Sequence, residues 1–399
     1  MPNKGVADRE MMLVSGSFDH TIGLWRRREN MGPTETLERE IKNGGELIDL
    51  SDDEEDKDEA EDWEFSLILE GHESEVKNVA WSPSSQYLAT CSRDKSIWIW
   101  EDVGEEGDDE WETIAVLQEH TADVKCIAWR ENDGNGEVLA SGSYDDTVRI
   151  WREVEDGEWG SVAELEGHKG TVWALEWEPR VSQEKFDPER EFEMDGDADA
   201  EGFEDSPLPT KRLLSCSHDC TIRIWSLTPA PPPQNRPSYL NSGIPSTMRP
   251  APAEETWTCT ATLPKVHDLP IYSISWSPKT GRVVSTGADS KVAIYEERTK
   301  GRSSVGGEIE HEWVVLGVLE GGHGPYEINH VTWCTRYDPG KNYEGEEMVI
   351  TTGDDGAVRA WTMEMIMPVP AKNVIPAGRV RAMTLEDKVE AIMAGKSLA

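Results

Sequence analysis

The sequence predicts an all-β fold built from repeated four-stranded units. The 399 residues include 17 tryptophans but only 5 phenylalanines, and the tryptophans recur at the ends of alternating apolar segments. Many of these segments contain an aspartate-bearing turn between two strand-like runs, which is typical of a β-hairpin. Self-similarity of this kind indicates a repeat architecture, in which each unit buries its apolar faces against its neighbours.

Six hairpins align without gaps along the chain. Each begins with an apolar strand, passes through an aspartate-containing turn and ends on an aromatic residue. The copies "LATCSRDKSIWIW" at 88–100 and "LASGSYDDTVRIW" at 139–151 show the pattern clearly. The six closing aromatic residues are Trp25, Trp100, Trp151, Trp225, Tyr295 and Trp361.

A second shared unit precedes five of these hairpins. It contains a tryptophan, an apolar strand, a histidine and a further strand closed by tryptophan, as in "WEFSLILEGHESEVKNVAW" at 63–81. Together the two units give four short strands per repeat. Over most of residues 11–362 this pattern resembles the WD-repeat β-propeller, and we predict that fold.

The repeats are interrupted by insertions, because successive closing aromatics lie further apart than the about 40–45 residues of one blade. High charge, or high proline or Gly/Ser content, favours disorder in these insertions. They comprise two acidic segments, 27–62 and 180–210, a proline-rich segment, 228–256, and a Gly/Ser-rich segment, 297–311. Residues 1–10 form an N-terminal segment, and residues 363–399 form an extension with an expected helix near 384–396.

The blades that can be recognised in the sequence are too few to close a propeller ring. About five and a half blades are recognisable, whereas the resemblance implies seven blades, with a terminal strand pairing into the last blade. The start of the chain, "MPNKGVADREMM", does not resemble such a strand. Either the ring closes in an unusual way or the chain lacks its N-terminal blade, and we expect the second.

The charge composition of the chain disfavours some classes of binding partner. A formal net charge of −40 disfavours binding to nucleic acid or to an anionic membrane, since both need a basic surface. No apolar run is long enough to span a bilayer, and the start of the chain has no signal-peptide core. The six cysteines form no CxxC pair, which favours a reducing compartment, the cytoplasm and also the nucleus.

Histidine recurs at one position of the repeat, before the first strand of five units. In the WD-repeat family this histidine joins the turn aspartate, a strand hydroxyl and the closing tryptophan in a buried hydrogen-bonded network. The matching sets are His72, Asp94 and Trp100 (with Thr90 or Ser92 as the hydroxyl), His120, Asp145 and Trp151, and His168, Asp219 and Trp225. This structural use of histidine leaves no suggestive catalytic set, so we predict no enzyme, no cofactor and no metal site.

Two further motifs have competing interpretations. Cys216 and Cys220 flank a turn, but a zinc site needs further ligands in paired spacing, so ordinary cysteines are favoured. The stretch "GELIDLSDDEE" resembles a SUMO-interacting motif, with Leu47, Ile48, Leu50 and Ser51 followed by acids. A solvated acidic loop is the favoured alternative for this stretch.

A cationic and aromatic patch is predicted on one face of the propeller. The residue before each turn aspartate and the second residue of each innermost strand should lie near the same rim. In three successive blades these positions hold Arg93, Lys77, Lys125, Tyr144 and Trp173. Arginine and aromatic side chains anchor interfaces, so we predict a partner-binding surface for acidic segments. The alternative is that Arg93 only pairs with nearby acids such as Asp94.

The segments "TCSRDKSIWIWE" and "SYDDTV" resemble the WD-repeat subunit of the cytosolic iron–sulfur protein assembly (CIA) targeting complex. The resemblance is strong over 64–178 and fair over 11–26 and 211–362, and it suggests a fungal-type member with long insertions. It implies a non-catalytic scaffold that docks apo-proteins for late [4Fe–4S] insertion. The implied partners are a small α/β CIA subunit with a reactive cysteine, a large HEAT-repeat CIA subunit and apo iron–sulfur client proteins. The alternative is a generic scaffold, such as a ubiquitin-ligase substrate receptor or a chromatin-complex subunit.

Overall fold

The computed structural model describes residues 10–28, 63–104, 110–131, 136–155, 158–179, 212–228, 255–302 and 309–366. Within these residues the chain forms six antiparallel sheets and one short helix, α2 (Met363–Ile366). Three predicted features lie outside the described residues: the motif at 47–51, most of the acidic and proline-rich insertions, and the helix near 384–396.

Each sheet is one blade, and we label the blades A to F in chain order. In the described residues blades B to E have four strands each, and blades A and F have three. The strands are β1 (Glu10–Gly16), β2 (Ile22–Arg28) and β3 (Glu64–Leu69) in blade A; β4 (Val76–Trp81), β5 (Tyr87–Ser92), β6 (Ile97–Asp102) and β7 (Trp111–Leu117) in blade B; β8 (Val124–Trp129), β9 (Val138–Ser143), β10 (Val148–Glu155) and β11 (Glu158–Leu165) in blade C; β12 (Val172–Trp177), β13 (Leu213–Ser217), β14 (Ile222–Leu227) and β15 (Trp257–Thr262) in blade D; β16 (Ile271–Trp276), β17 (Val283–Gly287), β18 (Val292–Arg302) and β19 (Ile309–Leu319) in blade E; and β20 (Ile328–Thr335), β21 (Glu347–Gly353) and β22 (Val358–Trp361) in blade F.

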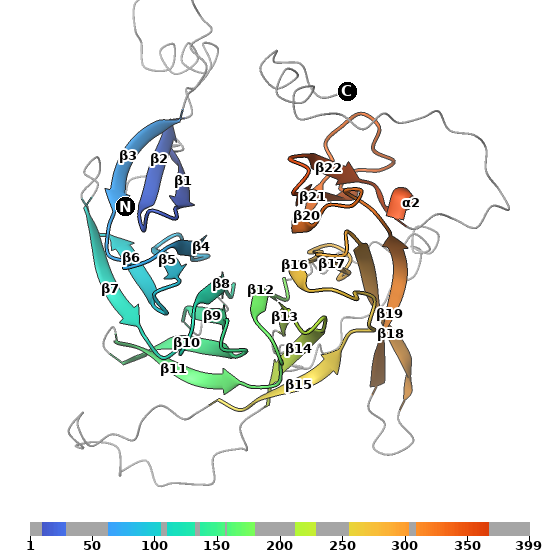
Figure 1. Ribbon diagram of the computed structural model, residues 1–399, viewed down its shortest axis with the longest axis horizontal. Coiled ribbons are helices and arrows are strands. Elements are labelled where there is room, and N and C mark those ends of the chain that lie inside the picture. Colours follow the sequence, from blue (N-terminus) through green and yellow to red (C-terminus); the bar gives the residue numbers. More distant parts are fainter. Residues whose placement is uncertain are drawn as a thin grey trace, which may run out of the picture.

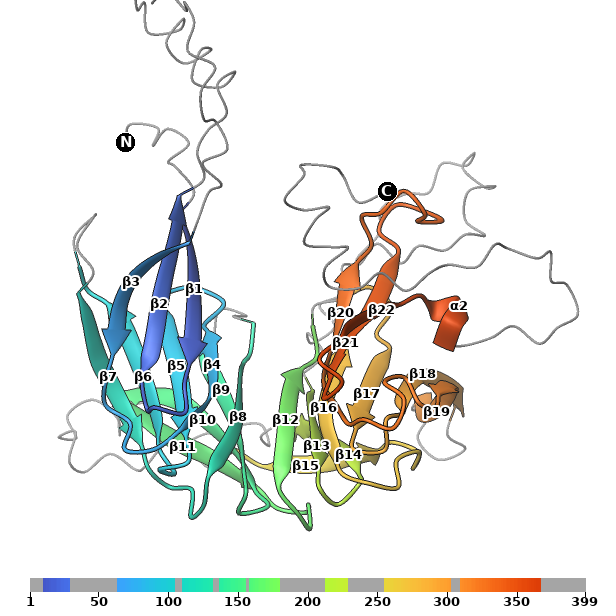
Figure 2. The same ribbon diagram turned by 45° about the horizontal axis from the view of Figure 1, so that its top comes forward.

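The blades are arranged around a central channel (Figure 1). The first strands of blades B to F, β4, β8, β12, β16 and β20, contact one another in sequence and line this channel. Blades A and F stand at the two ends of the arc, which is open between them in both views (Figures 1 and 2). The all-β propeller predicted from the sequence is confirmed with six blades, and the count of seven stays a prediction.

Apolar side chains fill the space between neighbouring blades. One buried cluster lies between each adjacent pair, as with Ile99 of β6, Leu139 of β9 and Trp151 of β10 between blades B and C. Because strand residues alternate between the two faces of a sheet, each blade contributes one set of apolar residues to each neighbour. Burial of a large aliphatic side chain contributes roughly 1.5–3 kcal/mol, so these clusters hold the arc together.

The segment 297–311 differs from the prediction. It was expected to be a disordered insertion, but β18 continues to Arg302 and β19 begins at Ile309. The two strands stay paired through Arg298 and Glu312 and through Thr299 and His311. Backbone hydrogen bonds therefore extend an existing hairpin over the described residues 297–302 and 309–311.

Candidate partner-binding surface

A buried hydrogen-bonded network recurs beneath the hairpin tips of blades B to F. In blade B, His72 Nδ1 lies 2.9 Å from Asp94 Oδ2, and His72 Nε2 lies 2.9 Å from Thr90 Oγ1. Trp100 Nε1 donates to the same Thr90 hydroxyl at 3.0 Å. The equivalent residues in the next blades are His120, Asp145, Ser141 and Trp151 in blade C, and His168, Asp219, Ser215 and Trp225 in blade D.

The direction of the network follows from its donors. Tryptophan can only donate, so the Thr90 hydroxyl oxygen accepts from Trp100. The ionised Asp94 carboxylate can only accept, so His72 Nδ1 donates to Asp94. Burial opposes ionisation of Asp94, but hydrogen bonds from His72 and Ser96 outweigh burial and hold its pKa well below 3.8.

The sequence left the strand hydroxyl of blade B undecided between two residues. The structure selects Thr90, because Ser92 makes different bonds. Ser92 Oγ donates to the carbonyl of Ser74 at 3.0 Å and accepts from the Asp94 backbone N–H at 3.1 Å. Ser92 therefore fixes the turn, whereas Thr90 belongs to the network.

The network places each hairpin tip beside the start of an innermost strand. In blade B the backbone N–H of Arg93 donates to the Glu75 carbonyl at 3.0 Å, and in blade C that of Tyr144 donates to the Asp123 carbonyl at 2.8 Å. The same bond joins Asp354 to Glu327 in blade F at 3.0 Å. Tip residues of blades B to F thus lie on one face, next to the channel.

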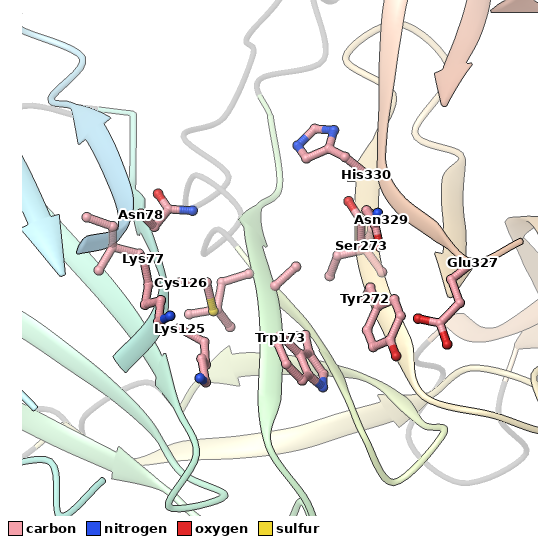
Figure 3. Close-up of a pocket in the computed structure, with 14 residues that line it drawn as sticks. Lys77, Asn78, Lys125, Cys126, Trp173, Tyr272, Ser273, Glu327, Asn329 and His330 are labelled. Carbon is pink, nitrogen blue, oxygen red and sulfur yellow. The ribbon is translucent and has the colours of Figure 1, made fainter. Parts of the chain in front are cut away.

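A β-bulge at the start of each innermost strand explains why one side chain per blade lines the mouth of the channel. The strand register skips one residue in blades B to F, and such a bulge turns the extra side chain away from the regular ladder. The five skipped residues are Lys77, Lys125, Trp173, Tyr272 and Asn329. Figure 3 shows all five around the cavity at the channel mouth.

The predicted cations and aromatics of blades B to D meet at this mouth. Lys125 Nζ lies 5.6 Å from the Trp173 ring centroid and 5.8 Å from the Tyr144 ring centroid. Trp173 in turn packs edge-to-face on Tyr272, with ring centroids 5.3 Å apart. Tyr144 is 60% exposed, so part of this cluster is open to a partner.

Arg93 is exposed and is paired with acids other than Asp94. Its side chain is 58% exposed, and its Nη1 lies 3.0 Å from Glu75 Oε1. Its Nε also lies 4.0 Å from Asp123 Oδ2, and the same Asp123 oxygen accepts from Lys125 Nζ at 3.0 Å. The Ser74 hydroxyl and Arg93 bind Glu75 and lower its pKa to about 2, so Glu75 is ionised at neutral pH.

Lys77 differs from the other two cations of the patch. Its Nζ lies 4.3 Å from the ring centroid of Phe18, a side chain from blade A that is 72% exposed. Within the described residues no carboxylate forms an ion pair with Lys77, whereas Arg93 and Lys125 are both paired. Lys77 therefore leaves a positive charge uncompensated at the channel mouth.

The cavity at the mouth has a volume of about 570 Å³. Besides the five bulge residues, it is lined by Glu327 and His330 of blade F, which the sequence interpretation did not single out (Figure 3). Glu327 occupies the position before an innermost strand, as Glu75 and Asp123 do in their blades. An alignment of that position across the repeats would have found it.

No metal centre is found in the part of the chain that the structure describes, since no three histidine, cysteine or acidic side chains come together there. The thiols of Cys91, Cys126 and Cys216 are buried, and burial raises the pKa of each one. The pKa of the Cys126 thiol is raised to about 12. These thiols therefore behave as small apolar groups. Among the same described residues, no helix is long and apolar enough to cross a bilayer.

Comparison with known proteins agrees with this architecture. The WD40 family model, described as WD domain, G-beta repeat, matches residues 63–101, 111–152, 205–226 and 257–296. The chain is 62% identical over 369 residues to the probable cytosolic iron-sulfur protein assembly protein 1 of Botryotinia fuckeliana, covering 90% of this chain and 81% of that protein.

Proteins of the same printed name from two other fungi are also similar. That of Sclerotinia sclerotiorum is 61% identical over 90% of this chain and 80% of its own length. That of Pyricularia oryzae is 48% identical over 89% of this chain and 81% of its own length. The chain therefore belongs to the WD-repeat family of cytosolic iron-sulfur protein assembly protein 1.

Proposed function

We propose that this protein is a non-catalytic adaptor of the CIA targeting complex. In this role it docks apo-proteins for late [4Fe–4S] insertion, with the cluster as cargo and the propeller as a binding platform. The proposed partners are the small α/β CIA subunit with a reactive cysteine, the large HEAT-repeat CIA subunit and the apo iron–sulfur clients. The names of the relatives support a cytosolic location, and some clients would be met in the nucleus.

One observation carries the docking part of this proposal. The five bulge residues line the channel mouth, beside the exposed hairpin tips of Arg93 and Tyr144. Rigid aromatics beside cations suit a protein interface, because they lose little conformational entropy and can bind carboxylates. The buried network beneath holds these tips in place, so the surface is organised before a partner arrives.

Binding of the purified chain to the small α/β partner and an iron–sulfur client tail tests this proposal. The test variant is Arg93→Glu, and the matched control is Arg298→Glu on the outer ribbon of blade E. The two arginines are 58% and 56% exposed and each pairs with a glutamate, so the substitutions change the charge equally. Circular dichroism verifies that all three proteins are folded.

We expect Arg93→Glu to weaken binding at least tenfold, or about 1.4 kcal/mol, and Arg298→Glu to leave it unchanged. Equal losses in both variants would show that only net charge matters and would remove the docking surface from the proposal. Absence of binding by the folded wild-type chain would contradict the adaptor role for this chain.

A further inference from the structure

The mouth of the channel carries opposite charges on its two sides. Figure 3 shows Lys77 and Lys125 on one side of Trp173, and Tyr272 and Glu327 on the other. Asp354 lies at the hairpin tip of the same blade as Glu327, and its backbone N–H donates to the Glu327 carbonyl at 3.0 Å. The basic side therefore belongs to blades B and C, and the acidic side to blade F.

The charges that count for binding are those left without a partner of opposite sign. On the basic side, Arg93 and Lys125 pair with Glu75 and Asp123, and Lys77 has no acidic partner among the described residues. This leaves one net positive charge, beside the exposed ring of Phe18.

On the acidic side, neither carboxylate has a basic partner in the described part of the chain. Asp354 accepts a hydrogen bond from Asn329 Nδ2 at 2.6 Å. Burial, a hydrogen bond to Glu327 and the charges of Glu327 and Asp354 together raise the pKa of Tyr272 to about 12. Asn329 and Tyr272, which hydrogen-bond to Asp354 and Glu327, are both neutral, so the acidic side keeps a negative charge.

An aromatic floor separates the two sides. Trp173 and Tyr272 pack edge-to-face at 5.3 Å, and both line the cavity of about 570 Å³. Cation–π contact holds Lys125 over Trp173, which keeps the basic side chain next to this floor. A ligand that spans the mouth would therefore meet positive charge, then aromatic surface, then negative charge.

We propose that the channel mouth binds a short peptide segment of a partner protein in which acidic and basic residues are segregated. Its acidic end lies over Lys77, an apolar or aromatic residue lies on Trp173 and Tyr272, and its basic end lies over Glu327 and Asp354. This inference rests on the proposed adaptor function and names the charge pattern of the segment that docks. A purely acidic tail would use only half of the surface and would be repelled by the other half.

Fluorescence anisotropy with three labelled peptides tests the inference. The first has three glutamates, a tryptophan flanked by serines, and three lysines; the second has the same composition with alternating charges; the third has glutamates on both sides. Binding is measured at 50 mM and 300 mM NaCl, because screening shortens the range of charge interactions below about 10 Å above 0.1 M salt. The test variants are Lys77→Glu, Glu327→Lys and the two combined.

The matched controls change the same charges far from the channel. Lys300→Glu replaces a 62% exposed lysine on the outer ribbon of blade E, and Glu112→Lys replaces an exposed glutamate on β7. We expect the segregated peptide to bind at least tenfold more tightly than the alternating one at 50 mM NaCl, and this preference to shrink at 300 mM. Each single test variant should lose at least tenfold, and the controls less than twofold.

The combined variant gives the sharpest result. It makes the basic side negative and the acidic side neutral, because Asp354 keeps its charge, so the segregated peptide can turn around and should bind at least threefold more tightly than it binds the Lys77→Glu variant. Equal binding of the segregated and alternating peptides, or no recovery in the combined variant, would overturn the inference. Binding of the all-acidic peptide that depends on Lys77 but not on Glu327 would also overturn it, while leaving the proposed adaptor function intact.

Discussion

The hairpin tip of blade B contains two neighbouring residues with opposite environments. Asp94 is 9% exposed and is bound by His72 within the network, whereas Arg93 is 58% exposed at the channel mouth. The network below the tips satisfies every one of its polar groups, and the mouth above leaves Lys77, Glu327 and Asp354 without partners of opposite charge in the described residues. The same repeat thus buries one position in the network and exposes the adjacent position at the surface that we propose for recognition.

The difference between the two layers also appears across the blades. The network has the same histidine–aspartate–hydroxyl arrangement in blades B to F, although Tyr295 replaces tryptophan in blade E. The bulge position, in contrast, changes from lysine to tryptophan, tyrosine and asparagine around the channel. A constant interior therefore supports a variable surface.

Removal of a network histidine should have the largest effect on stability. His72→Ala leaves Thr90 and Asp94 without their partner in a buried site, and we expect a loss of about 3 kcal/mol in the free energy of unfolding. Arg93→Ala, one residue from Asp94, should cost less than about 0.5 kcal/mol. Urea unfolding followed by tryptophan fluorescence measures both; similar losses would show that the two layers do not differ in this way.

The second prediction concerns the dependence of stability on acidic pH, to which the network contributes through Asp94. The folded-state pKa of Asp94 lies below its ordinary value of 3.8, so at mildly acidic pH the unfolded state binds more protons than the folded state. Stability is therefore full at neutral pH and declines as the pH falls below about 4. Asp94→Asn should lose less stability between pH 6 and pH 3 than wild type does, by about 1 kcal/mol; parallel pH profiles would contradict this role of Asp94.

Glu176 should show the opposite pH dependence. It lies on β12 and accepts a hydrogen bond from the Trp276 backbone N–H at 2.5 Å, and burial raises its pKa to about 8. The folded state then holds a proton that the unfolded state has lost, so this group's contribution to stability falls as the pH rises from about 4.5 to 8.

Glu176→Gln replaces the ionisable carboxyl group with a neutral amide and keeps an oxygen that accepts from the Trp276 backbone N–H. We expect the stability of the variant relative to wild type to rise by about 1 kcal/mol between pH 5 and pH 6, and to stop rising above about pH 8. Thermal unfolding at the two pH values measures the difference, with Glu158→Gln on exposed β11 as the control. A constant difference across this range would show that Glu176 is not protonated in the folded protein.

The smallest effect on stability is expected at the mouth itself. Tyr144 is 60% exposed, so Tyr144→Ala should change the unfolding free energy by less than about 0.5 kcal/mol. The same change should weaken client-tail binding severalfold, because the aromatic ring beside Lys125 is lost. Paired unfolding and anisotropy measurements would separate the two effects, and a destabilised but fully binding variant would place Tyr144 in the framework instead.

The sequence predicted the fold and the network because both depend on repeated local patterns. His72, Asp94 and Trp100 occupy fixed positions in a repeat, so five copies of the pattern support one another. The ion pairs of Arg93 were not predictable in this way, since Glu75 and Asp123 come from different loops while Asp94 is adjacent in sequence. The extended hairpin of blade E was missed because Gly/Ser composition was given more weight than strand alternation on either side of it.

The bulges at the channel mouth place side chains that the strand ladder does not use on the surface that we propose for partner binding. A bulge residue has no counterpart on the adjacent strand, so exchanging its side chain leaves the strand register as it is. Trp173 differs from the other four because it also packs against the core between blades D and E. The other four positions, Lys77, Lys125, Tyr272 and Asn329, can therefore be varied singly or together on a constant framework. A library randomised at these positions would offer new binding specificities without a search for new folds.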